Sequence, residues 1–188
     1  MSKIKELKEL AQNYKVLYVE DDIDIQHSMS VYLSKFFLEV KSASNGKEGL
    51  AEYFEGDYDL VVTDLSMPVM NGIEMIKQIK KLNSEQLVLV TSAHSESEYM
   101  VGAIEAGIDG YIIKPFNFEQ LNNELFKIVE KLYKFAENEK YKTDLEKLVA
   151  NKTQMLSTLL QTQHDNYEKT IYSMVEMIED RDTSEVEC

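Results

Sequence analysis

Short apolar runs alternate with stretches of helical periodicity from Lys15 to about Leu132. The runs have the length of strands, and the central ones are apolar throughout, as is typical of strands covered on both faces. Such an alternation indicates βα units and a parallel sheet, because parallel neighbours need a crossover helix. The sequence therefore predicts an α/β fold. Strands are predicted at residues 15–19, 38–43, 59–63, 87–91 and 110–113, and helices at 24–36, 46–55, 72–81, 96–106 and from about Asn117.

The composition narrows the class of protein. With 188 residues, the chain can form one domain of ordinary size plus an extension. Its net charge of −14, from 34 acidic and 20 basic residues, argues against nucleic acid or an anionic membrane as the main partner. No apolar stretch approaches the length that spans a bilayer, and the single Cys188 cannot form an internal disulfide. We expect a cytoplasmic protein whose partners are proteins.

Polar signals follow three of the predicted strands. They are Asp21-Asp22 after the first strand, Asp64 after the third and Lys114-Pro115 after the fifth. Because the carboxyl ends of parallel strands meet at one edge of a sheet, these side chains are predicted to converge. Alone, each has an ordinary interpretation, as a solvated turn, a helix cap or a strand exit. Their joint placement favours a functional site.

The chemistry of that site follows from its charges. Mg²⁺ prefers oxygen ligands, so Asp22 and Asp64 are predicted as direct ligands, with Asp21 acting through water or from outside the ligand shell. A carboxylate beside Mg²⁺ can attack a phosphoryl group, and we assign that role to Asp64. Lys114 supplies positive charge for a phosphoryl oxygen, and Pro115 fixes its loop.

Over about residues 15–133 the sequence resembles the receiver domain of two-component response regulators. The resemblance is carried by the acidic pair at residues 19–22, the loop at 64–72 and Lys114-Pro115-Phe116. It implies a flavodoxin-like, doubly wound sheet of five parallel strands in the order 2-1-3-4-5. It also implies that Asp64 is the phosphoacceptor, that Asp21 and Asp22 are the magnesium-binding acids, and that the Ser66 carbonyl is a backbone ligand.

The same resemblance implies a switch. Ser92 lies 28 residues after Asp64 and 22 before Lys114, which selects it rather than Thr91 as the hydroxyl that bonds the phosphoryl group. Tyr111, three residues before Lys114, matches the switch aromatic, although ordinary packing in an edge strand is the alternative.

Two further positions are predicted to tune the lifetime of the phosphate. They are Ser66, two residues after Asp64, and His94, two residues after Ser92. A solvated loop histidine is the alternative for His94.

Residues 117–188 contain no Gly or Pro and predict a continuous helix. One apolar stripe is expected to pack on the sheet; its residues are Leu121, Leu125, Ile128, Leu132 and Phe135. A second stripe favours a parallel two-chain coiled coil, with folding back onto the domain as the alternative. It comprises Leu145, Leu148, Val149, Met155, Leu156, Leu159 and Leu160.

The chain thus divides into an amphipathic helix at residues 1–14, a receiver at 15–133 and a helical linker at 134–188. In the first of these, Ile4, Leu7 and Leu10 are expected to face a surface. Residues 170–183 resemble the opening helix of HD-GYP domains, which hydrolyse cyclic di-GMP at a metal centre. The histidine that follows Arg181-Asp182 in those domains is missing, so a regulator truncated before its output domain is expected.

The leading hypothesis is a phosphorylation-dependent signalling protein that is not itself an enzyme beyond its own phosphorylation and dephosphorylation. Its predicted partners are a histidine kinase or phosphotransfer protein and a second copy of the chain, its cofactor is Mg²⁺, and neither nucleic acid nor membrane is a partner. One alternative is the regulatory half of a cyclic di-GMP phosphodiesterase. Another is a dimeric scaffold whose receiver does not switch.

Overall fold

The computed structural model describes residues 3–93 and 97–185 and contains a five-stranded parallel sheet. The strand order is β2-β1-β3-β4-β5, which confirms the predicted doubly wound α/β fold. The strands are β1 (Lys15–Val19), β2 (Glu39–Ala43), β3 (Leu60–Asp64), β4 (Leu87–Ser92) and β5 (Gly110–Ile113). The helices are α1 (Lys3–Ala11), α2 (Ile23–Leu33), α3 (Gly46–Glu55), α4 (Gly72–Leu82), α5 (Ser97–Glu105) and α6 (Phe118–Glu185).

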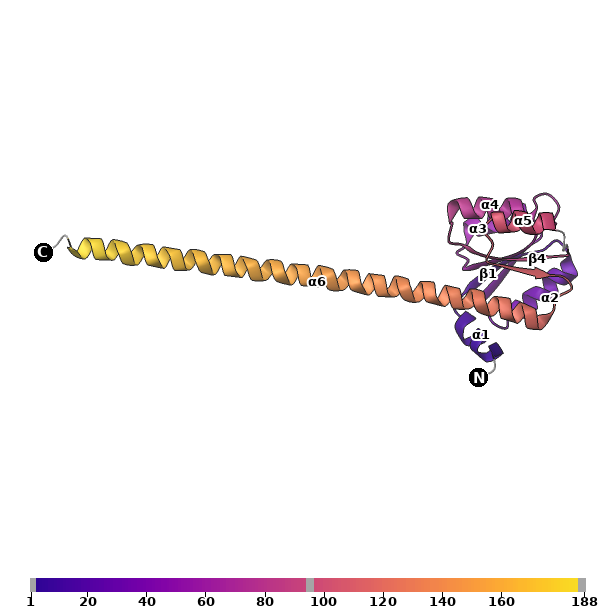
Figure 1. Cartoon of the computed structure of the whole chain (residues 1–188), viewed down its shortest axis with the longest axis horizontal. Coiled ribbons are helices and arrows are strands. Elements are labelled where there is room, and N and C mark those ends of the chain that lie inside the picture. The colour runs from indigo at the N-terminus through magenta and orange to yellow at the C-terminus, as the bar shows by residue number, and fades with distance from the viewer. Residues whose placement is uncertain (1–2, 94–96, 186–188) are drawn as a thin grey trace. The chain divides into compact units, whose positions relative to one another are not determined.

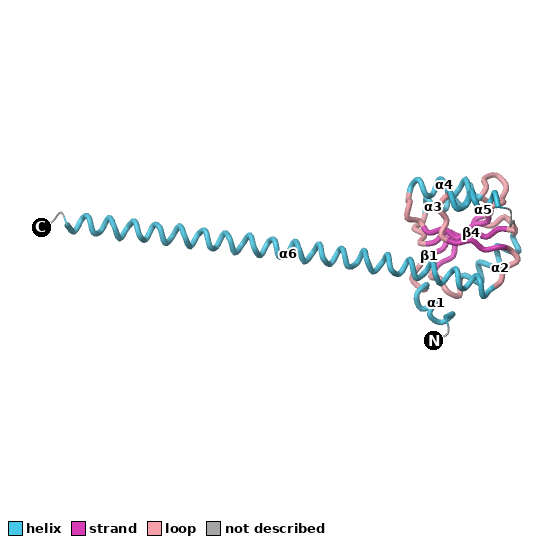
Figure 2. Tube along the Cα trace, viewed as in Figure 1, coloured by secondary structure: helices cyan, strands magenta, loops and turns pink. Residues whose placement is uncertain are grey.

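Helices cover both faces of the sheet (Figures 1 and 2). One core cluster contains Leu7, Tyr18 and Leu125 and lies on the side of α1, α2 and the first part of α6. The other contains Leu17 and Ile76 and lies on the side of α3, α4 and α5. Alternate residues of the inner strands enter opposite clusters, which explains why those strands are apolar throughout.

The helix predicted at residues 24–36 is shorter than expected. It begins at Ile23 because the Asp22 side chain caps it, and it ends at Leu33. Phe36, the last residue of the predicted helix, and Phe37 are buried in the turn that follows, and both of their backbone N–H groups donate to the Leu33 carbonyl. Their apolar side chains fill the core without continuing the helix.

The N-terminal helix α1 packs into the same compact unit as the sheet. Leu7 and Ala11 are buried in the same cluster as the first part of α6, whereas Ile4 is exposed. Lys3 donates to the Asn123 side chain at 2.7 Å. The chain divides by its contacts into one compact unit, Met1–Phe135, and a second, Ala136–Cys188. The segment predicted as a separate element at residues 1–14 therefore completes the core of the first unit.

The part of α6 within the first unit packs largely as predicted. Leu121, Leu125 and Ile128 are buried and Leu132 packs against them, but Phe135 is exposed. In the second unit the predicted apolar stripe is exposed along its whole length. Within the part of the chain that is described, none of the helices is long and apolar enough to cross a membrane.

Candidate functional site

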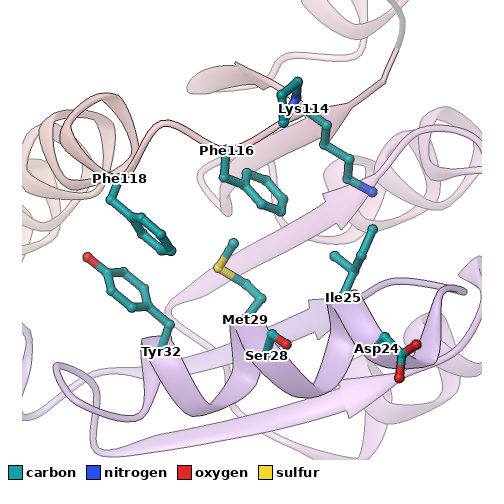
Figure 3. Close-up of a pocket in the computed structure, with 9 residues that line it drawn as sticks. Asp24, Ile25, Ser28, Met29, Tyr32, Lys114, Phe116 and Phe118 are labelled. Atoms are coloured by element: carbon teal, nitrogen blue, oxygen red, sulfur yellow. The ribbon is translucent and has the colours of Figure 1, made fainter.

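A pocket of about 380 Å³ lies between α2 and the segment that follows β5 (Figure 3). Its wall is mostly apolar, with Ile25 and Tyr32 from α2 opposite Phe116 and Phe118. Lys114 also lines this pocket, which therefore reaches the carboxyl edge of the sheet.

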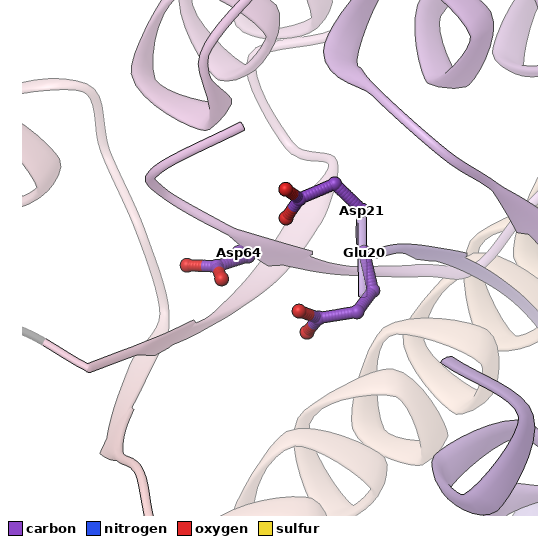
Figure 4. A group of neighbouring side chains, drawn as sticks. All are labelled: Glu20, Asp21 and Asp64. Atoms are coloured by element: carbon purple, nitrogen blue, oxygen red, sulfur yellow. The ribbon is translucent and has the colours of Figure 1, made fainter. Parts of the chain in front are cut away.

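Three carboxylates gather at that edge (Figure 4). Asp64 is the last residue of β3, and Glu20 and Asp21 directly follow β1. One oxygen from each carboxylate lies within 4.8 Å of the others. Glu20 is 1% exposed and Asp64 6%, whereas Asp21 is open to solvent. Carboxylates this close repel one another, so a bound cation would stabilise the group.

Lys114, which directly follows β5, bridges two of these carboxylates. Its Nζ donates at 2.7 Å to both carboxylate oxygens of Glu20 and at 2.7 Å to Oδ2 of Asp64. The Tyr18 hydroxyl donates to Glu20 Oε2 at 2.9 Å. Lys114 therefore offsets part of the negative charge and holds Glu20 and Asp64 in fixed positions.

The surroundings shift the pKa values of these groups. Burial raises the pKa of Glu20 above its ordinary value, and the bonds from Lys114 and Tyr18 offset this only in part. Burial alone would lower the pKa of Lys114, but its bonds to Asp64 and Glu20 and the charges of those residues raise the pKa overall. Lys114 is therefore a permanent positive charge at neutral pH.

A comparison with known protein families identifies this arrangement. The family model for the response regulator receiver domain matches residues 16–126, which include the three carboxylates and Lys114. The chain belongs to the response regulator receiver family.

Known receiver proteins agree with this assignment. Chemotaxis protein CheY-3 of Vibrio cholerae is 36% identical over 128 residues, covering 65% of this chain and 97% of CheY-3. Transcriptional regulatory protein ResD of Bacillus subtilis is 36% identical over 103 residues, covering 55% of this chain and 42% of ResD. The chain also covers 55% of CiaR of Streptococcus pneumoniae, so it spans about half the length of these two regulators.

Solved structures show the same fold. The N-terminal domain of an uncharacterized protein from Wolinella succinogenes is 33% identical, with a TM-score of 0.59 and coverage of 67% of this chain and 98% of that domain. The BeF3-activated DrrB receiver domain is 30% identical, with a TM-score of 0.58 and coverage of 63% and 99%.

The structure changes one member of the predicted acidic site of this receiver. Asp22, predicted as a metal ligand, lies outside the carboxylate group: its Oδ1 accepts from the N–H groups of Asp24 and Ile25, at 3.0 Å each, and caps α2. The third carboxylate is Glu20, which sequence reasoning missed. The signal is present in the strand alternation, since Glu20 lies two residues after Tyr18 and therefore on the same face of the sheet.

The other predicted residues of the receiver are placed as follows. The Ser66 N–H donates to Asp64 Oδ1 at 3.3 Å, and Ser66 itself is exposed. Ser92 is buried at the end of β4, and its carbonyl accepts from the Lys114 N–H at 2.8 Å. Tyr111 is half-buried and packs against the core cluster on the side of α4 and α5. His94 lies outside the described residues, so its role stays a prediction.

The loop from Asp64 to Gly72 folds tightly against the site. The Gly72 N–H donates to the Leu65 carbonyl at 2.9 Å, and Gly46 donates to Met70 at 3.0 Å. Val69 has φ 71°, a left-handed conformation that costs a β-branched residue about 1–2 kcal/mol. This tight loop places Gly72, the first residue of α4, against the backbone carbonyl of Asp64.

Gly72→Ala is expected to lower the free energy of unfolding by about 2–4 kcal/mol, because a Cβ at this position would collide with the backbone carbonyl oxygen of Asp64. Urea denaturation followed by circular dichroism measures this loss. The matched control is Gly102→Ala within α5, whose added Cβ meets only the flexible tip of Ile73, at 3.2 Å. The control should be neutral or stabilise by up to about 1 kcal/mol. Equal effects of the two changes would contradict the close packing at Gly72.

Proposed function

We propose that this receiver accepts a phosphoryl group on Asp64 from a histidine kinase or phosphotransfer protein and passes the change to its C-terminal helix. The observation that carries the proposal is the group formed by Glu20, Asp21 and Asp64 with Lys114 bound to two of its members. Apart from backbone groups, transfer of a phosphoryl group requires a nucleophile, a metal cation and a positive point charge. Asp64 is the nucleophile, Lys114 is the point charge, and the carboxylates are ligands for the cation.

The carboxylates suit Mg²⁺ as the cation. The ion takes oxygen ligands that lie about 3–4 Å apart around an octahedron, and the three carboxylates offer oxygens within 4.8 Å of one another. Glu20, Asp21 and Asp64 would hold it, with Glu20 in the place of the direct ligand that sequence reasoning gave to Asp22. The Ser66 carbonyl remains the predicted backbone ligand. Bound there, Mg²⁺ would neutralise charge on the transferring phosphoryl oxygens.

The chemical step follows from the positions of Asp64 and Lys114. One carboxylate oxygen of Asp64 attacks the phosphorus, and a new O–P bond forms while the bond from phosphorus to the donor's imidazole nitrogen breaks. The electron pair stays on that nitrogen. Lys114, now at 2.7 Å from Asp64 Oδ2, is close enough to move to a phosphoryl oxygen as charge develops there. Ser92 and Tyr111 are the predicted switch residues; Ser92 ends β4 beside β5, which carries Tyr111.

The pocket between α2 and the segment after β5 is the proposed docking surface for the phosphoryl donor. It adjoins Lys114 and is lined by apolar side chains, and Ile23, at the start of α2, adds further exposed apolar surface. A helical donor protein that buries such surface would bring its phosphohistidine toward Asp64.

The proposal is tested by incubating the chain with acetyl phosphate and Mg²⁺ and measuring its intact mass. We expect one added phosphoryl group, which appears only when Mg²⁺ is present and is lost on treatment with hydroxylamine, as acyl phosphates are. A chain that stays unmodified under these conditions and also fails to bind beryllofluoride would contradict the proposed function.

Lys114→Met is expected to lower the free energy of unfolding by about 3 kcal/mol at neutral pH, because it leaves Glu20 and Asp64 buried without their cation. Adding Mg²⁺ should restore part of the loss. So should lowering the pH. Burial raises the pKa of Glu20, and the variant lacks the Lys114 bond and charge that lower this pKa, so its folded state takes up a proton more readily than that of the wild type and the destabilisation shrinks on acidification.

Thermal unfolding across pH, with and without Mg²⁺, measures these effects. The control is Lys134→Met, which removes an exposed pair with Glu130 and should change stability by less than about 0.5 kcal/mol. A Lys114→Met protein as stable as the wild type in the absence of Mg²⁺ would show that the charge balance described here is wrong.

For the C-terminal helix we propose pairing with a second copy of the chain as a parallel coiled coil. Exposed apolar residues of the second unit recur every eleven residues, a period that keeps them on one face of a helix pair with a right-handed supercoil. The recurring sets are Leu145, Leu156 and Tyr167; Leu148 and Leu159; and Val149, Leu160 and Ile171. A second copy of the chain has the same eleven-residue period, so in a parallel pair each apolar residue of one helix lies opposite the equivalent residue of the other.

The resemblance of residues 170–183 to the start of an HD-GYP domain stays a prediction. In the structure this segment is part of α6. A role as the regulatory half of a cyclic di-GMP phosphodiesterase would fit a dimeric helical linker. It would be supported if the chain, joined to such a catalytic domain, made cyclic di-GMP hydrolysis depend on the phosphorylation of Asp64.

A further inference from the structure

One buried hydroxyl near the site has no role in the mechanism above. Among the residues that the structure describes, Thr91 Oγ1 is the buried side-chain polar atom that makes no hydrogen bond. Thr91 is 0% exposed, so water does not replace the missing partner at its surface. A buried hydroxyl without a partner destabilises the folded state, and native proteins contain few of them. Its position therefore calls for a physical reason.

The strand register places Thr91 beside the phosphoacceptor. Thr91 of β4 and Asp64 of β3 are direct partners in the sheet. Leu89 and Val62, two residues before each of them, both belong to the core cluster on the side of α2 and α6. Because side chains alternate along a strand, Thr91 and Asp64 point to that same face of the sheet. Ser92 points to the other face, so the two neighbouring hydroxyls cannot have the same role.

In the unphosphorylated protein, both carboxylate oxygens of Asp64 already accept hydrogen bonds from residues other than Thr91. Its Oδ2 accepts from Lys114 at 2.7 Å, and its Oδ1 accepts from the Ser66 N–H at 3.3 Å. A phosphoryl group would convert one of these oxygens into the bridging oxygen and leave the other as a carbonyl. The phosphoryl oxygens would then compete for Lys114, so that the Asp64 side chain would lose its strongest donor.

We propose that Thr91 is a hydrogen-bond donor for the phosphorylated state. Its hydroxyl donates to the side-chain carbonyl oxygen of phosphorylated Asp64 once Lys114 binds the phosphoryl group. The inference rests on the proposed function of Asp64. It explains why a threonine occupies a buried position where valine would fill the same volume without an unpaired hydroxyl. The unpaired Thr91 hydroxyl destabilises the unphosphorylated protein, and its hydrogen bond to Asp64 forms only in the phosphorylated state.

The test compares stability with the binding of beryllofluoride, which bonds to a carboxylate oxygen as a phosphoryl group does. Thr91→Val removes the hydroxyl and keeps the shape. It is expected to raise the Tm by about 2–4 °C and to weaken beryllofluoride binding in the presence of Mg²⁺ about tenfold. Thr91→Ser keeps the hydroxyl and should bind beryllofluoride within about twofold of the wild type.

Thr63→Val is the matched control for stability. Thr63 is equally buried at the same edge of the sheet, but its hydroxyl donates to the backbone carbonyl of Asp64 at 2.9 Å. This variant should lower the Tm. The inference is overturned if Thr91→Val binds beryllofluoride as tightly as the wild type, or if Thr91→Ser loses as much affinity as Thr91→Val. A wild-type chain that fails to bind beryllofluoride at all would instead refute the proposed function of Asp64.

Discussion

Asp64→Asn is expected to abolish both uptake of a phosphoryl group from acetyl phosphate and the binding of beryllofluoride. An amide lacks the anionic oxygen that attacks phosphorus. Lys114 cannot replace it because its protonated Nζ has no free electron pair, and Glu20 is a poor substitute because both of its oxygens accept hydrogen bonds from Lys114 at 2.7 Å. Intact-mass measurement after incubation with acetyl phosphate and Mg²⁺ gives the result directly. The backbone of β3 should be unchanged, so circular dichroism should report a folded protein.

Asp22→Asn is the matched control for that experiment. Asparagine is as good a helix cap as aspartate, so α2 should remain intact. If Glu20, Asp21 and Asp64 hold the cation, Asp22→Asn should be phosphorylated at a rate within about twofold of the wild type, since no direct ligand changes. A loss as large as that of Asp64→Asn would restore Asp22 to the position of a direct ligand and remove Glu20 from it.

The second large effect concerns the oligomeric state. Light scattering is expected to give twice the mass of one chain for the wild type and the mass of one chain for a protein carrying Leu156→Asp and Leu159→Asp. These leucines are more than half exposed in the isolated helix, and charges in their place would be buried in the coiled coil. The control carries Gln154→Asp and Gln161→Asp, which add the same charge on the opposite face and should leave the dimer intact. A wild-type chain that is monomeric at micromolar concentration would contradict the proposed pairing.

Cysteine cross-linking tests the eleven-residue period within the same proposal. In a Cys188→Ser background, Tyr167→Cys should form an intermolecular disulfide readily, because this residue recurs in phase with Leu145 and Leu156. Asn166→Cys should not, although a seven-residue repeat starting at Leu145 would place it in the seam. Cross-linking at 166 but not at 167 would favour the seven-residue repeat. A dimer that cross-links at neither position would point to an antiparallel arrangement.

The fold was predictable because its determinants are local. Each strand is a short apolar run, and each crossover helix begins near a capping or turn residue such as Asn45 or Asn71, both of which cap helices in the structure. The spacing of Asp64 and Lys114 from these runs was enough to bring them to one edge. Secondary structure and connectivity thus follow from periodicity and from the geometry of parallel sheets.

The details that sequence reasoning missed depend on tertiary packing. Glu20 is a carboxylate that the fold buries, and only the contacts of Lys114 and Tyr18 show why it is tolerated there. The short α2 depends on Phe36 and Phe37 finding the core from a turn. Strand alternation places Glu20 on the same face of the sheet as Tyr18, but periodicity predicts neither the burial of this carboxylate nor the early end of α2, because both depend on which surfaces meet.

The packing of α1 bears on where this receiver can be cut. The family match ends at residues 16 and 126, but Leu7 and Ala11 before it and Ile128 and Val129 after it are at most 3% exposed. A protein trimmed to the matched limits would present the apolar surface beneath these side chains to water. Such a patch promotes aggregation, so poor solubility of a trimmed receiver would reflect the cut itself rather than an unstable fold. A piece that ends at Phe135, the limit of the first compact unit, keeps this surface covered.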